Sequence, residues 1–504
     1  MPKALIQRFN GGMINDPRTE SASSCMVATN FDINTNPSKL LPNRATESGY
    51  SGQSTGKLQN FTIGYRSAGA EYVLFGLGVV SGQSYANILY KTLSSLDTDA
   101  WSTPAYGASA SGVTSFDLFV YYQRTGLIYG AKAGTHIWAF DTTAATPFAE
   151  THRAISYTTI AQGLVHSKDD ILYIPYDNKI ASNNNGSWTD AALTLPEYLK
   201  INSISEYGNY LAIACANKNT GGNSRLFLWD RNTSITTVSE SIDLGYGEVK
   251  IIEEIDGTLI SVSTIGGTTT SVRDKVVFRY LTGNQMIKFN ELVSSYFGSG
   301  SVQLPKGKFR ANGKLFFMLK MIINGATREG LFSIGRASQS SPFTVAHELT
   351  LNNATATSGS VLYNFTVVGD YTFMSYVDNS VYTLSKSQDQ ATYTTSIYES
   401  LINPGMASGD RVNKKQLVGV AVNHDPLTSG QTVVLKYRVD AANTANWTTI
   451  YTSSTEGDAR FETSLDASGT QFTSGTNYEF RLESTGGAVI TGLSYVYDNL
   501  NALV

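Results

Sequence analysis

Cysteine and histidine are both scarce in this sequence. Its two cysteines, Cys25 and Cys215, cannot build a disulfide framework, which fits folding in a reducing compartment and leaves one bridge between them open. The five histidines are His136, His152, His166, His347 and His424. None has a second histidine or a cysteine at zinc-ligand spacing, so we expect no zinc site.

Charge and long apolar runs are scarce as well. Charged residues make up 15% of the chain, against about 25% in an ordinary globular protein. The net charge is −4 without a run of either sign, so we expect no basic face for a nucleic-acid backbone and no primary role in DNA binding. The longest apolar stretch, LFFMLKMII at 315–323, is broken by Lys320 and is too short to cross a bilayer. Because the first residues lack a continuous apolar segment, we expect no secretory signal and no membrane insertion.

Aromatic and turn-forming residues are abundant instead. The chain has 29 Tyr, 22 Phe and 45 Gly, and Ser, Thr and Asn are frequent, while stretches dominated by Ala, Leu, Glu and Lys are few. This composition favours short strands joined by polar turns over amphipathic helices. The sequence therefore predicts an all-β protein.

One phrase recurs seven times: a Gly, Asp or Asn turn, an apolar strand, a polar connection and a second apolar strand. The copies begin at Glu71, Gly126, Asp169, Gly208, Asp256, Asn312 and Gly369. Their spacing of roughly 40 to 60 residues is close to that of four-stranded propeller blades. We therefore expect a β-propeller of about seven blades over residues 45–401. A pair of β-sandwiches is the alternative.

The pattern changes after a polar stretch at 402–415. Six strand candidates follow within about 90 residues: KQLVGVAVNH, QTVVLKYRV, NWTTIY, ARFETSL, NYEFRLES and AVITGLSYVYD. In the second of these, Val433, Leu435 and Tyr437 alternate with polar residues, which is typical of a strand with one buried face. In YEFRLES, Glu479 and Arg481 are expected on an exposed face. Residues 402–504 are thus predicted to form a C-terminal β-sandwich.

Catalytic motifs are not found in the sequence. GQSTGKL at 52–58 lacks a spacer residue and the Ser or Thr of a phosphate loop, and GLGVVSG at 76–82 lacks the last Gly of a dinucleotide fingerprint. A GxSxG nucleophile elbow is also missing. We predict no catalytic, cofactor-binding or metal-binding residues, and no cofactor.

Some residues are weak candidates for binding or cleaving sugars. SNNNGSW at Ser182–Trp188 resembles the Ser-x-Asp-x-Gly-x-x-Trp turn of propeller sialidases, but Asn184 replaces the Asp and the Trp comes one residue early. The candidate acids for a glycosidase pair are Asp169, Asp170, Glu253, Glu254 and Asp256. The candidate stacking residues are Trp101, Trp138, Trp229 and Trp447. In each case a turn, a solvated surface or a packed core is the favoured interpretation.

Asn-x-Ser/Thr tripeptides are frequent. They begin at Asn60, Asn185, Asn232, Asn353, Asn364 and Asn446. Without a signal peptide we interpret them as a consequence of a composition rich in Asn and Thr, not as glycosylation sites.

The opening, RFNGGMINDPR followed by NFDINTNPSKLLPNR, is expected to form an extended N-terminal arm over residues 1–44, with a short helix in ESASSCMVATNF. It resembles the opening of tailed-bacteriophage virion proteins that continue into a propeller-like domain and a small β-sandwich. The matching positions are Phe9, Gly11, Gly12, Asn30, Phe31, Asp32, Leu40 and Pro42.

This resemblance implies a non-enzymatic structural protein of the tail nozzle, hub or collar type. Such a protein is assembled in the host cytoplasm, located in the virion tail and built into an oligomeric ring. Its implied partners are other tail or head–tail connector proteins, with genomic DNA passing through without sequence-specific binding during DNA ejection. The near-neutral charge is consistent with such a conduit. A propeller that binds or cleaves a host surface glycan is the alternative.

Overall fold

The structure is a computed structural model of the 504-residue chain. It describes residues 3–6, 9, 13, 25, 27–36, 38–48, 57–79, 86–98, 101–102, 109–110, 117–132, 134–141, 148–219, 222–234, 238, 241–266, 273–297, 302–323, 325–351, 360–378, 381–387, 393–402, 414–440 and 446–500. Regular structure in these residues is almost all β-strand, with two short 3-10 helices, η1 (Ser67–Gly69) and η2 (Leu93–Ser95). Among the described residues, no helix is long and apolar enough to span a membrane.

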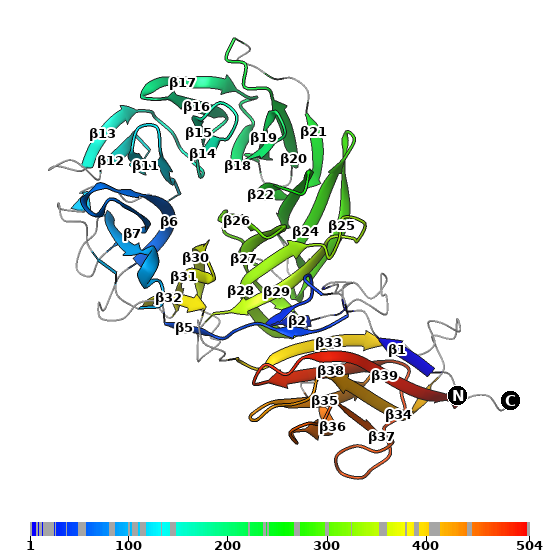
Figure 1. Ribbon diagram of the computed structural model, residues 1–504. Helices are drawn as coiled ribbons and strands as arrows, with labels where there is room; N and C mark the ends of the chain where they lie inside the picture. The colour runs from blue at the N-terminus through cyan, green and yellow to red at the C-terminus, as the bar shows by residue number, and fades with distance from the viewer. Residues whose placement is uncertain are drawn as a thin grey trace.

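Groups of four antiparallel strands follow one another along the chain and form a ring (Figure 1). We call each group a blade and number the blades in chain order. Blade 1 contains β6 (Lys57–Arg66), β7 (Glu71–Val79), β8 (Ala86–Thr92) and β9 (Ser109–Ala110). Blade 2 contains β10 (Phe119–Tyr122), β11 (Leu127–Lys132), β12 (His136–Asp141) and β13 (Phe148–Ala154). Blade 3 contains β14 (Leu164–His166), β15 (Ile171–Tyr176), β16 (Lys179–Asn184) and β17 (Ser187–Thr194).

The second half of the ring repeats this order. Blade 4 contains β18 (Leu199–Tyr207), β19 (Tyr210–Asn217), β20 (Asn223–Trp229) and β21 (Ile242–Tyr246). Blade 5 contains β22 (Glu248–Ile255), β23 (Thr258–Ile265), β24 (Arg273–Thr282) and β25 (Gln285–Phe297). Blade 6 contains β26 (Lys308–Ala311), β27 (Lys314–Ile323), β28 (Ala326–Gly335) and β29 (Thr344–Thr350). Blade 7 contains β30 (Val361–Val368), β31 (Tyr371–Asp378), β32 (Val381–Ser387) and, from the N-terminal region, β5 (Thr46–Ser48).

The predicted all-β propeller is confirmed, and each of the seven recurring phrases forms the two central strands of one blade. The corresponding hairpins are β7–β8, β11–β12, β15–β16, β19–β20, β23–β24, β27–β28 and β31–β32. The turn that opens each phrase connects the first strand of its blade to the second strand. At Asp256 and Gly257, for example, both φ angles are positive (48° and 77°), the conformation that a tight two-residue hairpin turn requires.

Apolar residues fill the spaces between blades, because each sheet buries both faces against its neighbours. Six separate hydrophobic clusters lie between blades 1 and 2, 2 and 3, 3 and 4, 4 and 5, 6 and 7, and 7 and 1. The largest cluster begins between blades 5 and 6 and continues into the C-terminal region. The ring is therefore stabilised by a core at every junction rather than by one central core.

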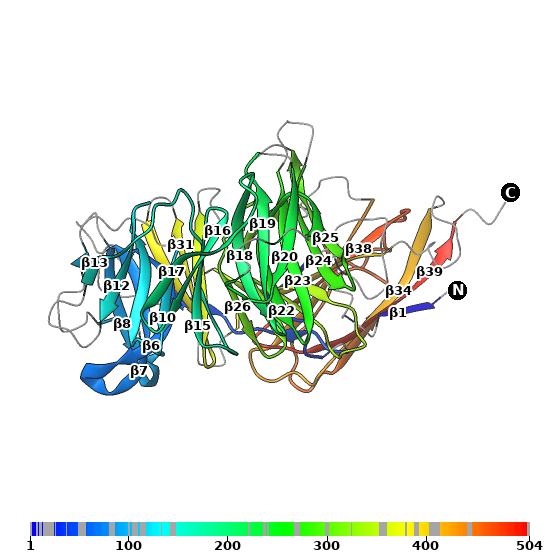
Figure 2. The same ribbon diagram turned by 90° about the horizontal axis from the view of Figure 1, so that it is seen from above.

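The C-terminal region is joined to blade 6 by a continuous sheet of nine strands. After β29 the sheet continues through β2 (Val27–Thr29), β33 (Ser396–Ile402), β38 (Tyr478–Thr485), β35 (Thr432–Val439) and β36 (Thr448–Ser453). A second sheet contains β1 (Lys3–Ile6), β39 (Ile490–Asn499), β34 (Lys415–His424) and β37 (Arg460–Thr463). The two sheets pack through residues such as Phe480 and Tyr495, whose ring centroids are 5.8 Å apart. Both views place this region at one side of the ring (Figures 1 and 2).

All six C-terminal strand predictions are confirmed, and Val433, Leu435 and Tyr437 are buried as expected. The expectation of an exposed second face is wrong for Glu479, which is 7% exposed. The reason is that charges pair across the strands on this face. The pairs are Arg438–Glu479, Arg481–Glu399 and Lys436–Glu483, and the Trp447 ring lies 4.4 Å from the guanidinium carbons of both Arg438 and Arg481.

The strand pairings cut across the predicted ranges 1–44, 45–401 and 402–504. Strands β1 and β2 of the N-terminal range belong to the two C-terminal sheets, and β33, which spans the boundary between the second and third ranges, pairs with β38. The predicted short helix is wrong at Val27–Thr29, which is a strand, while Glu20–Ser24 lie outside the described residues. The β-branched Val27 and Thr29 suit a strand that pairs on both sides. Strands β3 (Phe31–Asp32) and β4 (Leu41–Pro42) complete the N-terminal region as a two-stranded sheet.

Candidate functional site

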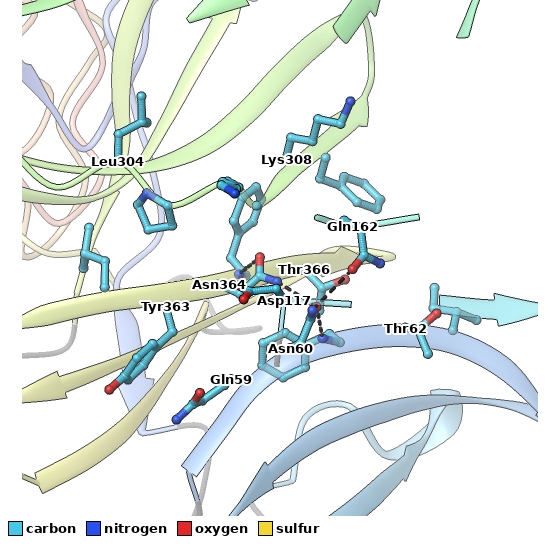
Figure 3. Close-up of a pocket in the computed structure, with 18 residues that line it drawn as sticks. Gln59, Asn60, Thr62, Asp117, Gln162, Leu304, Lys308, Tyr363, Asn364 and Thr366 are labelled. Carbon is cyan, nitrogen blue, oxygen red and sulfur yellow. Dashed lines mark hydrogen bonds between the residues drawn. The ribbon is translucent and has the colours of Figure 1, made fainter. Parts of the chain in front are cut away.

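The first strand of each blade lies on the inner side of the ring (Figure 1). Toward the ring centre, first strands of several blades line a cavity of about 610 Å³ (Figure 3). Its walls come from blades 1, 6 and 7 and from the residues that precede β10 and β14. The lining residues are Gln59, Asn60, Phe61, Thr62, Ile63, Asp117, Gln162, Leu304, Pro305, Lys306, Gly307, Lys308, Phe309, Leu362, Tyr363, Asn364, Phe365 and Thr366. This volume is within the range of small-molecule sites.

A chain of side-chain amides crosses the cavity wall and links four blades (Figure 3). Asn364 Nδ2 of blade 7 donates to Asn60 Oδ1 of blade 1 over 2.7 Å, and Asn60 Nδ2 donates to Gln162 Oε1 over 3.4 Å. Gln162, just before blade 3, in turn binds Phe119 of blade 2, donating to its carbonyl oxygen over 2.6 Å and accepting from its N–H over 3.0 Å. Because these amides form hydrogen bonds with other groups of the protein, they hold the wall of the cavity in place.

Asn60 and Asn364 have the same local geometry. Each accepts a hydrogen bond of 2.8 Å at Oδ1 from the N–H of the next residue, Phe61 or Phe365. Each also lies at a register shift between the first two strands of its blade. The shift turns the amide toward the neighbouring blade instead of into the sheet ladder.

The two lysines of the cavity have different surroundings. Lys308 Nζ donates to the carbonyl oxygens of Ile204 (2.6 Å) and Ile252 and pairs with Glu253 Oε2 at 2.6 Å, so its three donors are used. Lys306 has no hydrogen bond or ion pair within the part of the chain that the structure describes. Its pKa is lowered, mainly by burial.

Charges around Lys306 modify this burial effect. The negative charge of Asp117 raises the Lys306 pKa, the positive charges of Lys250 and Lys200 lower it, and Glu248 raises it slightly. Glu248 is held between Lys200 (2.9 Å) and Lys250 (2.8 Å). Burial acts to raise the pKa of Glu248, but its hydrogen bonds and attraction to Lys250 and Lys200 outweigh burial and lower the pKa to about 2.

The five candidate acids lie at the contacts between blades. Each makes an ion pair with a basic residue of an adjacent blade: Asp169 with Arg231 at 2.6 Å, Asp170 with Arg124 at 3.5 Å, Glu253 with Lys308 at 2.6 Å, Glu254 with Arg310, and Asp256 with Arg336 at 3.6 Å. A glycosidase needs one carboxyl group that protonates a leaving group beside a second carboxylate. These acids instead connect blade 3 to blades 2 and 4, and blade 5 to blade 6.

The candidate tryptophans are buried or pack against other side chains of the protein. Trp138 and Trp229 are buried, Trp101 packs against Phe61 and Phe373, and Trp447 covers two arginines. The SNNNGSW segment is the hairpin turn between β16 and β17, in which Asn183 Oδ1 accepts from the N–H of Gly186 over 2.7 Å. The turn interpretation fits this geometry.

Metal-site geometry is not found either: the described residues contain no group of three or more His, Cys, Asp or Glu that could hold an ion. Neither Cys25 nor Cys215 forms a disulfide; both side chains are buried, and burial raises the pKa of each thiol. His347 is fully buried, stacked on Phe332 with ring centroids 4.3 Å apart.

Sequence reasoning missed the amide chain and Lys306. A signal for the amides was present, because Asn60 and Asn364 both begin the tripeptide Asn-Phe-Thr. We interpreted these copies as compositional, whereas they occupy equivalent places in the first strands of blades 1 and 7. Lys306 lies in a Pro-Lys-Gly-Lys stretch, and the pattern alone does not separate it from an exposed turn.

Comparison with protein-family models gave no match, and comparison with curated protein sequences gave none either. Among solved structures, the chain is similar to the Dos1 propeller, with 10% identity, a TM-score of 0.40, and coverage of 68% of this chain and 95% of the other. It is also similar to Kuenenia stuttgartiensis hydrazine synthase, with 12% identity, a TM-score of 0.35, and coverage of 54% of this chain and 86% of the other. Neither similarity bears on the activity of this chain.

Proposed function

We propose that this chain is a non-enzymatic structural component of a bacteriophage tail, of the nozzle, hub or collar type. In this proposal copies of the chain form a ring in the virion, assemble with other tail or head–tail connector proteins in the host cytoplasm, and help to conduct or retain the genome. The observation that carries the proposal is the contact network made by the motif residues of the N-terminal region.

Those residues connect the propeller to the C-terminal sheets. Phe9 is fully buried and contacts Tyr398 of β33 edge-on, with ring centroids 5.3 Å apart. Asn30, at a left-handed φ of 58°, donates from Nδ2 to Thr394 Oγ1 over 2.9 Å and accepts at Oδ1 from the N–H of Thr350 over 3.0 Å. Residues of the N-terminal motif therefore connect the propeller to the C-terminal sheets.

The remaining motif positions extend this junction. Asp32 pairs with Lys314 of blade 6 at 2.8 Å, and the N–H of Leu40 donates to the carbonyl oxygen of Ile490 in β39 over 2.8 Å. Phe31 is buried and pairs with Pro42. Gly11 and Gly12 lie outside the described residues. A propeller and a C-terminal region that share one nine-stranded sheet suit repeated assembly in a particle.

The charges near the ring centre are mixed. Lys200, Lys250, Lys306 and Lys308 are accompanied by Glu248, Glu253 and Asp117. These charges lie at the centre of one propeller and not in the channel between copies of the chain, so the proposal of a DNA conduit does not rest on them.

The glycan-binding alternative has weaker support. Its candidate acids are ion-paired between blades and its candidate tryptophans pack against other side chains. It becomes the leading proposal only if the chain is missing from particles.

The test is quantitative mass spectrometry of purified phage particles from the source lysate, with copies of this chain counted relative to the major capsid protein. A low ring-like number, such as the roughly six or twelve that the resemblance to tail proteins implies, supports the proposal. Absence from particles that contain the other tail proteins overturns it. Cryo-electron microscopy of the same particles locates the ring.

A further inference from the structure

The central cavity and the unpaired Lys306 together indicate a ligand site. A half-buried lysine without a hydrogen-bond or ion-pair partner is unfavourable, because the part of the ammonium hydration that is lost is not replaced. Lys306 lies in the cavity wall, whereas the neighbouring Lys308 is saturated by two carbonyl oxygens and Glu253. One of the two cavity lysines is therefore structural, and the other has its donors available to a bound molecule.

The local charge balance favours an anion. Three ammonium groups, those of Lys200, Lys250 and Lys306, share a region with the carboxylates of Glu248 and Asp117. Glu248 is already shared between Lys200 and Lys250. The sum of three positive and two negative groups is +1.

The volume favours an organic molecule over a single inorganic ion. About 610 Å³ is many times the roughly 30 Å³ that one water occupies in the liquid, and it matches the size of small-ligand sites. The wall also offers apolar surface at Leu304 and Phe309, beside the hydroxyl groups of Thr62 and Thr366. Such a mixture suits a molecule with a charged group and an uncharged body.

We propose that the central cavity of the propeller binds a small organic anion, with its carboxylate or phosphate group on the Lys306 ammonium. The bound anion accepts hydrogen bonds from the Lys306 ammonium, which Asp117 and Glu248 attract without forming an ion pair with it in the described residues. This site is independent of any role in a virion.

Isothermal titration calorimetry of the full chain with three matched probes tests the proposal: glucuronate, glucose 6-phosphate and glucose. At least one of the two anions binds while neutral glucose does not, and the pair distinguishes a carboxylate from a phosphate ligand. Lys306→Met weakens binding of that anion by at least about tenfold, since it removes a charge-assisted hydrogen bond. Lys306→Arg keeps the charge and binds within a few-fold of the parent protein.

Lys218→Met, at an exposed lysine in the turn after β19, is the matched control and leaves binding unchanged. Affinity decreases as the pH rises through the Lys306 pKa, earlier than for an ordinary lysine, with Asp117, Lys250, Lys200 and Glu248 as the charged groups that face it. The proposal is overturned if neither anion binds, or if Lys306→Met, shown to be folded by its thermal transition, binds as tightly as the parent protein.

Discussion

The ring of Phe9 packs edge-on against Tyr398, although 389 positions separate them in the chain (398 − 9 = 389). This contact fixes the start of the chain against β33, the strand that carries the blade 6 sheet into the C-terminal region. Because Phe9 is fully buried, the pair contributes both hydrophobic burial and aromatic contact to the junction.

Phe9→Ala is expected to lower the free energy of unfolding by about 3–5 kcal/mol, the usual cost of truncating a buried Phe. Urea denaturation followed by fluorescence measures it. Ile287→Ala, at a side chain that is 41% exposed, is the control and is expected to cost less than about 1 kcal/mol. Equal, small effects for both variants would contradict the role of Phe9 in the junction.

The amide chain gives a second prediction. Asn60→Ala and Asn364→Ala are each expected to cost about 1–3 kcal/mol, because each leaves a buried N–H or amide partner without an acceptor. The double variant is expected to cost less than the sum, by about 1 kcal/mol, since both single changes already break the Asn364–Asn60 bond.

Equilibrium denaturation of the four proteins in this cycle measures the coupling. Gln59→Ala, a change next to the amide chain but outside it, is the control. Strict additivity would mean that the two amides do not act through their shared hydrogen bond.

The propeller was predictable because its information is local. Each central hairpin is preceded by its own turn signal, such as Asp256–Gly257 between the apolar strands β22 and β23, and the C-terminal strands show period-two alternation. The junction was not predictable, because β2 meets β29 through a single parallel pair, Thr29 with His347, between distant parts of the chain. The cavity was not predictable either, since a sequence does not reveal which of two neighbouring lysines, Lys306 or Lys308, has partners on another blade.

His347 makes stability depend on pH. Burial, together with the nearby charge of Arg328, lowers its pKa to about 3 in the folded protein, against 6.5 for an ordinary histidine, despite backbone hydrogen bonds that act in the opposite direction. Between pH 6.5 and about 3, His347 is therefore protonated in the unfolded chain but neutral in the folded protein. The contribution of this group is complete above pH 6.5 and is lost as the pH falls toward 3, at about 1.4 kcal/mol per pH unit.

His347→Gln is expected to lessen the decrease in stability between pH 6 and pH 4 by up to this amount per unit. Above pH 7 the two proteins should show the same slope, because the histidine is neutral in both states there, and this range serves as the internal control. Urea denaturation at half-unit pH steps supplies the curves. Identical slopes at acid pH would show that His347 is protonated as easily in the folded protein as in the unfolded one.

Replacing Lys306 or Lys308 by Met should change the free energy of unfolding differently, although the two lysines are only two positions apart. Lys308→Met leaves the carbonyl oxygens of Ile204 and Ile252 without their donor and Glu253 without its counter-charge, so it is expected to cost about 2–4 kcal/mol. Lys306→Met removes a half-buried charge that makes no hydrogen bond or ion pair within the described residues, so stability should be unchanged or increased. Thermal and urea unfolding of both variants, without added anions, measure the difference. If Lys306→Met were as destabilising as Lys308→Met, Lys306 would have a structural partner, and its donors would not be available to a ligand.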